Sequence, residues 1–459
     1  MKSIFKQYDV RGVYGQELTK KDAYMIGYYF VKKTNISKCK VSIDCRLSSK
    51  DLAKYMILGL KSAGCDVIYM GLNSTPVFYY SLFCDDLKTG IQITASHNPA
   101  EDNGFKFVFE GNSFDYESGL KKLEVDVHDD LYNALVKFDS MVKEYEDMDY
   151  ESFILNKTIQ KNYLEDYVDF MSKFLDKIID DASILALKKL NIGVDFSSGM
   201  SSVALKKIFE KKGLVFDYYN DVLDGRFPNH LPEPPKAHDF LLDLEDEYDF
   251  FFAFDGDGDR IGVFDSKKEL VLNDYIIALM IDYFSKEHKH FVCDLRASKV
   301  IFDIADKRGV KVDKLRVGRS FYQRHLTSFN CFFGAELSGH TFFKEFFNLD
   351  NPDMALFYLL KLIVLNINDL PNMFLKYKIY YKIPEMNFSV ENPDSKLAEL
   401  KRNYISNLDS EMDGLSFKFS DCWFNLRKSN TENKIRLNIE GKDKASVERY
   451  LEKIKVFLG

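Results

Sequence analysis

Three aspartates alternate with glycine in residues 255–260, which read Asp-Gly-Asp-Gly-Asp-Arg. The run lies between two apolar stretches, residues 250–254 and 261–264, which predict strands. Three carboxylates on one glycine-relaxed loop repel one another, and a bound cation would neutralise them. Oxygen ligands suit a hard ion, and Mg²⁺ in proteins typically works beside phosphate. The run therefore predicts a divalent metal site that acts on a phosphate.

The same aspartate spacing also opens an EF-hand calcium loop, which needs glycine at its sixth position and a bidentate glutamate at its twelfth. Here those positions are Arg260 and Ser266, and the flanking segments predict strands instead of helices. A purely structural acidic turn is another alternative, but it would leave the three carboxylates without a cation. Magnesium is therefore the favoured ion, and Arg260 adds a charge that could bind phosphate.

A serine follows a predicted strand in residues 90–99, which read Gly-Ile-Gln-Ile-Thr-Ala-Ser-His-Asn-Pro. Ser96 would lie at the exit of the strand, where open α/β sheets bind ligands. A serine there is more often a turn or capping residue than a nucleophile, and His97 is not a base merely because it is adjacent. Lys106 follows on the next predicted strand, where it could also be a solvated strand end.

Three further segments carry polar groups of the kinds that bind sugars and phosphates. Residues 336–340 read Glu-Leu-Ser-Gly-His and offer donors and acceptors suited to sugar hydroxyls. Residues 427–434 place an arginine, two hydroxyls and an amide in one turn, which could cradle phosphate. Near the N-terminus, Arg11 could reach an anion or simply pair with Asp9. Ordinary loops look similar, so each segment is a modest signal alone.

Three segments repeat one pattern of strand, polar turn, helix, glycine and second strand. Their first strands lie at residues 41–44, 192–195 and 291–294, and each ends in aspartate. The second strands are expected at residues 67–69, 214–216 and 310–312. Such units pack helices against a mainly parallel or mixed sheet. Any α/β protein repeats strand, turn and helix, but the recurring aspartate favours three related α/β domains.

The chain after about residue 370 follows a different pattern. Strands are expected near residues 376–382, 415–419 and 435–439, and helices over 395–408 and 445–457, which indicates a small α+β domain. A chain of 459 residues is too long for one ordinary core. We therefore expect four domains: residues 1–145, 146–248, 249–368 with the metal-binding and sugar-binding loops, and 369–459.

Composition excludes several classes of protein. The net charge is −8 and no stretch is strongly basic, which argues against a nucleic-acid-binding protein. The N-terminus has no apolar signal core and no window approaches the length of a membrane span, so we expect a cytoplasmic protein that binds no membrane. Seven cysteines without a C-x-x-C pair predict reduced, mostly buried thiols.

Taken together, the motifs match one family in order and spacing. The chain resembles the α-D-phosphohexomutases, specifically the bacterial phosphomannomutase/phosphoglucomutase branch, over essentially its whole length. Residues 94–99 resemble the phosphoserine loop, 255–260 the metal loop, 336–340 the sugar-binding loop and 427–431 the phosphate-binding loop. The resemblance implies four domains around a central cleft, the first three related mixed α/β sheet domains and the last a small α+β domain.

The resemblance also implies a reaction, the reversible interconversion of hexose 1-phosphate and 6-phosphate, for mannose, glucose or both. Ser96 would carry a phosphate and donate it to the substrate. The resulting hexose 1,6-bisphosphate, which also serves as activator, would turn end over end and return its other phosphate to Ser96. Such transfer depends mainly on positioning and charge stabilisation.

Residue roles follow from the same resemblance. Ser96 and the three aspartates Asp255, Asp257 and Asp259 would hold Mg²⁺. Arg11, Lys106 and His340 are candidates for proton transfer or for stabilising transition-state charge. The implied substrate-binding residues are Arg260, Arg296, Arg319, Glu336, Ser338, His340, Arg427, Ser429, Asn430 and Thr431. The expected partners are hexose phosphates, bound by a monomer or a homodimer.

The chain departs from the family's usual pattern at several positions. Asn433 stands where relatives often carry proline, and Arg296 and Arg319 where they often carry lysine and histidine; an arginine cannot act as a base. Residues 348–353 differ from the usual acidic-glycine form. A phosphoglucosamine mutase is the nearest alternative, although residues 90–96 fit the mannose/glucose branch better.

Two alternatives belong to other functional classes. A sugar-phosphate-binding protein that lost turnover is disfavoured by the intact Ser96 and aspartates. A phosphatase with an aspartate nucleophile would leave the Ser96 loop unexplained.

Overall fold

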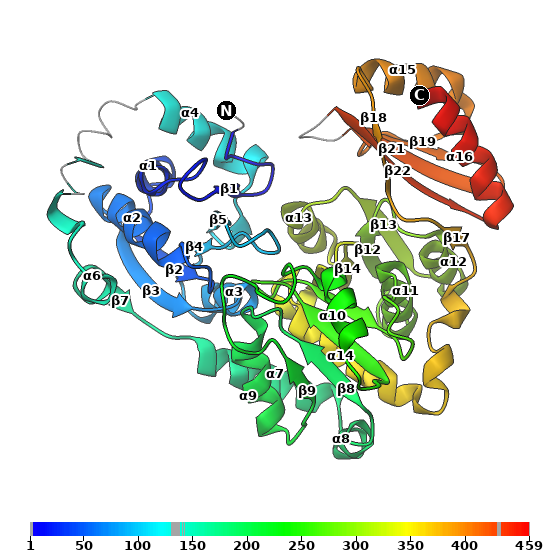
Figure 1. The fold of residues 1–459 in the computed structure, drawn as a ribbon, viewed down its shortest axis with the longest axis horizontal. Coiled ribbons are helices and arrows are strands. Elements are labelled where there is room, and N and C mark those ends of the chain that lie inside the picture. The colour runs from blue at the N-terminus through cyan, green and yellow to red at the C-terminus, as the bar shows by residue number, and fades with distance from the viewer. Residues whose placement is uncertain (1–2, 130–137, 140, 142, 429–432, 459) are drawn as a thin grey trace. The chain divides into compact units, whose positions relative to one another are not determined.

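The computed structural model describes residues 3–129, 138, 139, 141, 143–428 and 433–458 (Figure 1). The chain forms two compact units. The first comprises residues 1–271, 318–328 and 339–370, and the second comprises residues 272–317, 329–338 and 371–459.

The first sheet of the first unit is mixed, as the repeat pattern predicts. Its strand order is β1-β5-β4-β2-β3-β7, with β6 paired to β5. Strand β2 is parallel to β3 and β4, whereas β5 is antiparallel to both β4 and β1. The strands are β1 (Val10–Val13), β2 (Lys38–Ile43), β3 (Asp66–Leu72), β4 (Gly90–Ile93), β5 (Asp102–Phe109), β6 (Asn112–Ser113) and β7 (Ile159–Gln160).

Helices α1 (Lys20–Thr34) and α2 (Ser49–Ser62) cross at two glycines beside this sheet (Figure 1). A Cβ on Gly59 would lie 2.1 Å from the carbonyl oxygen of Tyr24, and one on Gly27 would lie 2.6 Å from that of Met56. Any larger side chain would force the helices apart, so both glycines are required by this close approach.

The second sheet has the order β11-β10-β8-β9. Strand β10 (Phe250–Phe254) is parallel to β8 (Ile192–Asp195) and antiparallel to β11 (Ile261–Phe264). The run of residues 255–260 is therefore the turn between two neighbouring strands of the sheet that contains the second repeat. This sheet continues across the domain boundary expected between residues 248 and 249.

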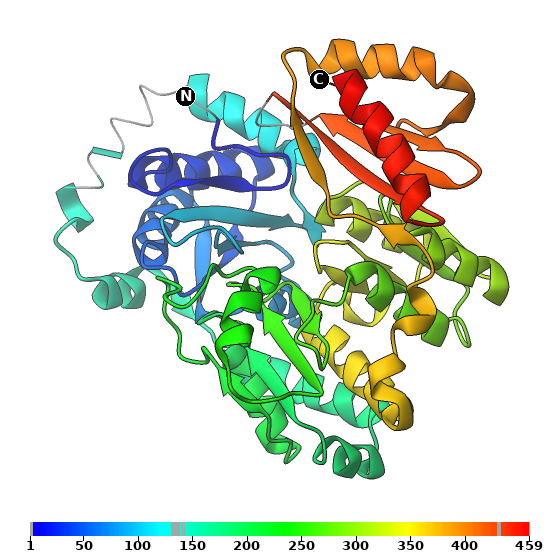
Figure 2. The same ribbon diagram turned by 45° about the vertical axis from the view of Figure 1, so that its right-hand side comes forward.

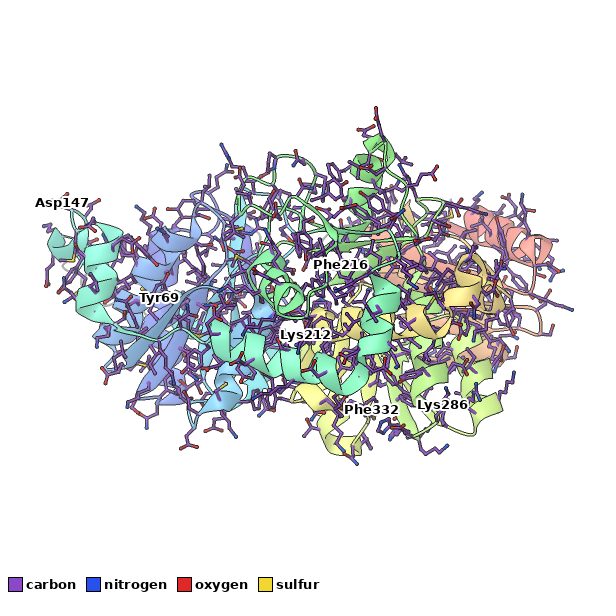
Figure 3. All side chains as sticks on the ribbon, turned by 90° about the horizontal axis from the view of Figure 1, so that it is seen from below. Tyr69, Asp147, Lys212, Phe216, Lys286 and Phe332 are labelled. Atoms are coloured by element: carbon purple, nitrogen blue, oxygen red, sulfur yellow. The ribbon has the colours of Figure 1, made fainter. Side chains whose placement is uncertain are left out.

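The last strand of the second repeat begins later than expected. The prediction of a strand at residues 214–216 is wrong, because β9 covers Asp217–Tyr219, after α9 (Ser201–Lys211). Phe216, labelled in Figure 3, instead packs edge-on against Phe209, and the ring centroids are 4.9 Å apart. Phe216 thus covers the helix rather than extends the strand, while Val215 is exposed.

The recurring aspartate at the strand ends has one structural role in all three repeats. Its Oδ1 accepts a hydrogen bond from the backbone N–H two residues later, at 3.0 Å from Asp44, 2.9 Å from Asp195 and 2.9 Å from Asp294. The side chain thereby closes an Asx-type turn where each strand gives way to its helix. The repeat seen in the sequence is thus a repeat of local structure.

The third repeat lies in the second unit. Strand β12 (His290–Asp294) is parallel to both β13 (Lys311–Leu315) and β14 (Phe333–Ala335). Helix α12 (Lys299–Arg308) connects β12 to β13, and α11 (Asn273–Phe284) precedes β12. The predicted order of strand, helix and strand is confirmed here.

The C-terminal part of the second unit is an α+β domain with a six-stranded antiparallel sheet, β17-β22-β21-β20-β19 with β18 paired to β22 (Figure 2). Both predicted helices are present, as α15 (Pro393–Asn403) and α16 (Lys444–Leu458). The strands are β17 (Tyr381–Lys382), β18 (Met386–Ser389), β19 (Leu408–Ser410), β20 (Leu415–Lys418), β21 (Cys422–Lys428) and β22 (Lys434–Gly441).

The domain differs from the expectation at two strands. The strand expected near residues 376–382 is present only as the short β17, which follows the 3-10 turn η5 (Leu375–Tyr377). Strand β21 was not expected, because its polar residues conceal the alternation; Asn425 is buried and bonds to Ser416 Oγ on the neighbouring strand at 3.0 Å.

Other helices and short strands complete the described parts of the chain: α3 (Thr75–Cys84), η1 (Tyr116–Leu120), α4 (Lys121–Asp129), α6 (Tyr150–Lys157), α7 (Leu164–Ile178), α8 (Asp181–Leu187), η2 (Pro234–Lys236), α10 (Ala237–Asp243), α13 (Arg319–Phe329), β15 (Thr341–Phe343), η3 (Lys344–Phe346), β16 (Leu349–Asp350), α14 (Pro352–Leu365), η4 (Ile367–Asn372) and η6 (Ile405–Asn407). Among the described residues, no single helix is long and apolar enough to cross a membrane; one pair bent by 102°, Pro352–Leu365 with Ile367–Tyr377, passes by length and composition alone. All seven cysteines are free thiols and five of them are buried, as predicted.

Candidate active site

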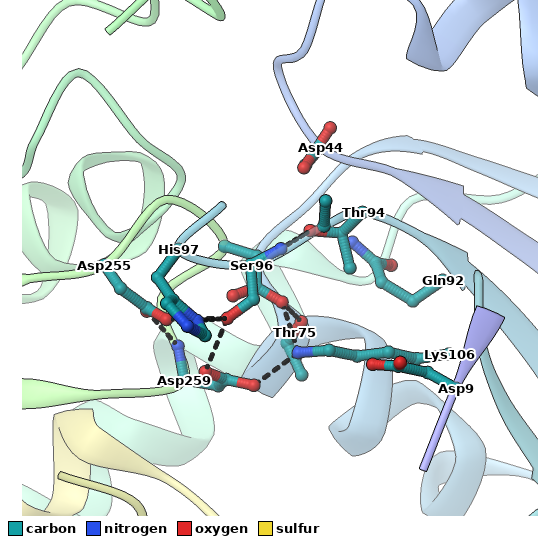
Figure 4. Close-up of polar contacts among 12 residues, drawn as sticks. Asp9, Asp44, Thr75, Gln92, Thr94, Ser96, His97, Lys106, Asp255 and Asp259 are labelled. Carbon is teal, nitrogen blue, oxygen red and sulfur yellow. Dashed lines mark hydrogen bonds and ion pairs between the residues drawn. The ribbon is translucent and has the colours of Figure 1, made fainter. Parts of the chain in front are cut away.

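Ser96 lies just beyond the end of β4 in a strained backbone conformation (Figure 4). Its φ is +53°, in the left-handed region that residues with a Cβ rarely adopt. Its N–H donates to the Thr94 hydroxyl at 2.9 Å, and the residue is 1% exposed. A strained residue persists only where its surroundings hold it, and such residues cluster at functional sites.

The hydroxyl of Ser96 faces the carboxylates of the metal loop (Figure 4). Its Oγ donates to Asp255 Oδ2 at 2.9 Å and lies 3.4 Å from Asp259 Oδ1. His97 Nδ1 is 3.3 Å from the same Oγ, but burial and the charges of Arg260 and Arg11 lower the pKa of His97. The structure therefore brings Ser96 to the aspartates and leaves His97 a neutral neighbour.

The three aspartates form a buried set of oxygen ligands. Asp255, Asp257 and Asp259 each offer an oxygen within 4.8 Å of the others. Burial and the two neighbouring carboxylates raise the pKa of Asp255 well above its ordinary value. Asp257 Oδ1 is buried and has no hydrogen-bond partner among the described residues. Crowded carboxylates with an unused buried oxygen fit a hard divalent cation, and so the residues present suit Mg²⁺.

Lys106 supplies the positive charge on the other side of these aspartates. It pairs with Gln92 across β4 and β5, and its Nζ donates to Asp257 Oδ2 at 2.5 Å and to Asp259 Oδ2. Burial opposes the charge of Lys106, but Asp257 and Asp259 raise its pKa above the ordinary value. Thr75 also donates to Asp257 Oδ2, at 2.6 Å. Lys106 is thus a protonated lysine and not a base in this arrangement.

Arg11 belongs to the same cluster. Its Nε donates to Asp9 Oδ2 at 2.9 Å, and its Nη1 donates to Ala95 O at 3.0 Å and Asn98 Oδ1 at 2.8 Å. The pairing with Asp9 considered from the sequence is therefore present, and the same guanidinium also contacts the serine loop. The binding of an anion by Arg11 stays a prediction.

His340 is oriented by a buried carboxylate that the sequence did not single out. Its Nδ1 lies 2.9 Å from Asp350 Oδ2, and its Nε2 accepts from Arg260 Nε at 3.1 Å. Because Nε2 accepts, the ring proton sits on Nδ1 and points at Asp350. Asp350 belongs to the segment 348–353 that departs from the usual family pattern, and only the fold places it behind His340.

Arg319 is buried at the start of α13 and is 8% exposed. Its Nη1 donates to the hydroxyl of Tyr79, and its guanidinium carbon lies 5.5 Å from the centre of that ring. Tyr79 thus holds Arg319 by both hydrogen bonding and cation–π attraction.

In the second unit, the segment 336–338 follows β14. Ser338 Oγ donates to Glu336 Oε2 at 2.9 Å, and Asn273 Nδ2 donates to the carbonyl oxygen of Leu337 at 2.8 Å. Glu336 is 3% exposed. The Ser338 hydroxyl and the Glu336 carboxylate are groups that can bond a sugar hydroxyl.

A cluster of arginines surrounds one carboxylate in the same unit. Glu385 lies 3.5 Å from Arg296 Nη1, 3.5 Å from Arg427 Nη2 and 3.4 Å from Arg436 Nη1, and it accepts from Asn438 Nδ2 at 2.9 Å. Burial opposes ionisation, but Asn438 and the arginines lower the pKa of Glu385. Three guanidinium groups thus converge on one carboxylate, and Arg296 and Arg427 also pair with Asp294 and Asp413.

Arg436 was missed in the sequence, although it lies directly across from Arg427 in the β21–β22 pair. The available signal was a second arginine on the strand after the predicted phosphate loop. That signal could be used only with the register between this strand and β21, and β21 was not expected. Ser429, Asn430 and Thr431 lie outside the described residues.

Comparison with known proteins identifies the family. Four domain models described as phosphoglucomutase/phosphomannomutase match in chain order: domain I at residues 2–129, domain II at 165–268, domain III at 273–374 and the C-terminal domain at 385–455. The chain belongs to the phosphoglucomutase/phosphomannomutase family. The expected architecture of three related α/β domains and one α+β domain is that of this family and is confirmed.

Individual members of the phosphoglucomutase/phosphomannomutase family match nearly the whole chain. A phosphomannomutase of Methanocaldococcus jannaschii is 32% identical over 98% of this chain and 96% of its own. A phosphomannomutase/phosphoglucomutase of Pseudomonas aeruginosa is 29% identical over 99% of this chain and 94% of its own. A crystal structure of a family protein from Burkholderia thailandensis is similar with a TM-score of 0.79 and 24% identity, covering 100% of this chain and 97% of that one.

Proposed function

We propose that this protein is a phosphohexomutase that interconverts the 1-phosphate and 6-phosphate of mannose, glucose or both, through a phosphoserine and a hexose 1,6-bisphosphate. One observation carries the proposal: the Ser96 hydroxyl lies 2.9 Å from Asp255 Oδ2, and Asp255 belongs to a loop that contains three buried aspartates. The names of the relatives, phosphomannomutase and phosphoglucomutase, support the choice of sugars.

The residues around Ser96 would share the work of phosphoryl transfer. Asp255, Asp257 and Asp259 would hold Mg²⁺, which when bound neutralises charge on the phosphate. Arg11 and Lys106 remain cationic and would stabilise the charge of the transferring phosphoryl group. Positioning these charges before the reaction is the main contribution a protein can make to such a transfer.

His340 is the residue we propose as general base and acid. Its Nδ1 proton is held by Asp350, so its Nε2 is the nitrogen that would take a proton from a sugar hydroxyl and return it, after releasing the hydrogen bond that it accepts from Arg260. Arg11 cannot lose its proton, and Lys106 is paired with two carboxylates. The three candidates from the sequence are thereby ranked by their partners.

Substrate recognition would be divided between sugar and phosphate contacts. Glu336 and Ser338 would bind sugar hydroxyls. The non-reacting phosphate would be bound by Arg296, Arg427 and Arg436 with Ser429, Asn430 and Thr431, while Arg260 and Arg319 would add positive charge. We further propose a cytoplasmic enzyme, active as a monomer or homodimer on these small phosphates.

The test combines kinetics with mass spectrometry. Purified protein with Mg²⁺ and a trace of glucose 1,6-bisphosphate should convert mannose 1-phosphate or glucose 1-phosphate to the 6-phosphate, and intact mass should reveal one phosphate that maps to Ser96. Ser96→Ala should lose turnover by at least about 10⁴-fold and lose that phosphate. Faster turnover of glucosamine 1-phosphate would favour a phosphoglucosamine mutase, and binding without turnover of any of the three would identify a sugar-phosphate-binding protein.

A further inference from the structure

We propose that Arg46 is the positioning residue of the phosphoserine loop, residues 94–99, and of the turn that follows it to Asp102. Arg46 touches no reacting atom; it would hold the backbone on either side of Ser96 so that the hydroxyl keeps its direction toward the metal loop. The inference rests on the proposed function and adds to it a residue outside the motifs that carry the chemistry.

The guanidinium of Arg46 uses both of its terminal nitrogens on this loop and turn, and its Nε lies beside one aspartate without a hydrogen bond to it. Nη2 donates to the carbonyl oxygens of Ser96 at 2.8 Å and Asn98 at 2.7 Å. Nη1 donates to those of Pro99 at 2.5 Å and Asp102 at 2.9 Å. Nε faces Asp44 Oδ2 at 3.2 Å. One planar side chain therefore fixes four carbonyl groups spread over seven residues.

Arg46 is sealed from water. It is 2% exposed, and the ring of Phe227 covers its guanidinium with 4.9 Å between the guanidinium carbon and the ring centre. Gly225 approaches the backbone before Arg46 so closely that a Cβ there would lie 2.3 Å from the carbonyl oxygen of Cys45. Without Arg46, the buried carbonyl oxygen of Ser96 would lose its donor, and an unbonded buried carbonyl is unfavourable.

The loop needs such an anchor because its central residue is strained. Ser96 has a φ of +53°, and its carbonyl oxygen receives Arg46 from one direction while Gly256 approaches from another. A Cβ on Gly256 would lie 2.7 Å from that oxygen. The peptide after Ser96 is thus held between Arg46 and the metal loop. This clamp sets where the hydroxyl points, because the side chain turns with its backbone.

The equivalent position in the second repeat supports the same role. Ser197 follows Asp195 by two residues, as Arg46 follows Asp44, and its Oγ donates to the carbonyl oxygen of Phe254 at 2.5 Å. Phe254 is the residue immediately before the metal loop. The residue two positions after the strand-end aspartate therefore anchors the serine loop in one repeat and the metal loop in the next.

The experiment compares wild-type protein with Arg46→Lys in the full chain. Lysine keeps the charge but has three donors on one nitrogen, so it cannot span four carbonyls. We expect kcat to fall about 100-fold, because small misplacements of a reacting group have effects of that size. The KM for the hexose phosphate should change less than about twofold, since uniform binding would be retained. Leu60→Ala, a buried change in α2, is the control for lost stability and should keep its kcat while its melting temperature falls.

A second measurement reads the anchor without relying on turnover. Hydrogen exchange of the backbone amides of residues 95–102 should accelerate at least tenfold in Arg46→Lys and stay unchanged in Leu60→Ala. Unchanged exchange in Arg46→Lys, or a fall in kcat no larger than that of Leu60→Ala at equal stability, would overturn the inference. Absence of mutase activity in the wild type would instead overturn the proposed function, and the exchange measurement would still decide whether Arg46 anchors the loop.

Discussion

Ser96 and Asp255 are 159 residues apart in the chain, and their side chains meet in a hydrogen bond of 2.9 Å. The first follows β4 and the second follows β10, so each lies at the carboxyl end of a strand in a different sheet. The serine oxygen and the carboxylate oxygens thereby share one buried space. A phosphate carried by the serine would meet a cation carried by the aspartates there.

Substituting Asp257 should abolish the stabilisation of the folded protein by Mg²⁺. Asp257→Asn keeps the shape and the acceptor for Thr75 but removes the charge that Lys106 and a cation share. We expect Mg²⁺ to raise the melting temperature of the wild type and to leave that of the variant nearly unchanged, since a ligand stabilises only the state that binds it. Thermal unfolding against Mg²⁺ concentration measures this. Ser266→Ala, outside the loop, is the control and should respond as the wild type does.

Asp350 should affect the rate more than the affinity. In Asp350→Asn, the imidazole of His340 loses the carboxylate that holds its Nδ1 proton, and we expect kcat to fall about 10²–10⁴-fold with KM little changed. Steady-state kinetics across pH measures both quantities. Asp239→Asn replaces an aspartate whose side chain is 99% exposed and should behave as the wild type. A rise in KM with kcat unchanged would show that Asp350 does not position His340 for catalysis.

Asp353 should make stability depend on pH. Burial raises its pKa to about 7, although the hydrogen bond from Tyr167 acts in the opposite direction. Because the folded pKa lies above the unfolded value near 3.9, the folded state retains the proton, and stability is lost as pH rises from about 4 through 7. Asp353→Asn keeps an acceptor for Tyr167 and removes the charge. Urea unfolding should find the variant close to the wild type at pH 4 and up to about 4 kcal/mol more stable at pH 8. A stability difference that is the same at both pH values would rule this out.

Arg436 should contribute to the affinity for the non-reacting phosphate. Arg436→Ala removes one of the three guanidinium groups around Glu385, and we expect KM for the hexose phosphate to rise about tenfold or more, since a charged hydrogen bond is worth about 1.5–3 kcal/mol. The matched control is Arg449→Ala in the same domain, whose side chain is 53% exposed and pairs with Asp421. If both variants show the same KM, Arg436 has no part in binding phosphate.

Much of the fold could be predicted because its repeats are local. Each strand-end aspartate closes a turn with the N–H two residues later, so the same short pattern precedes the helix in all three repeats. Strand β21 escaped prediction because the burial of Asn425 depends on its partner Ser416, which is set by sheet register and not by local pattern.

The sequence by itself determined the chemical groups: a serine after a strand, three oxygen ligands on a glycine-rich turn and a family of four domains. Glycine turns and strand ends are set by neighbouring residues, so such groups can be found along the chain. Only the tertiary structure decided which groups meet. The guanidinium of Arg46 bonds four backbone carbonyls at and after Ser96, which are as far as 56 positions away in the chain. Asp350 became the partner of His340 in the same way. Contacts of this kind depend on the packing of distant loops, and no local pattern of residues specifies that packing.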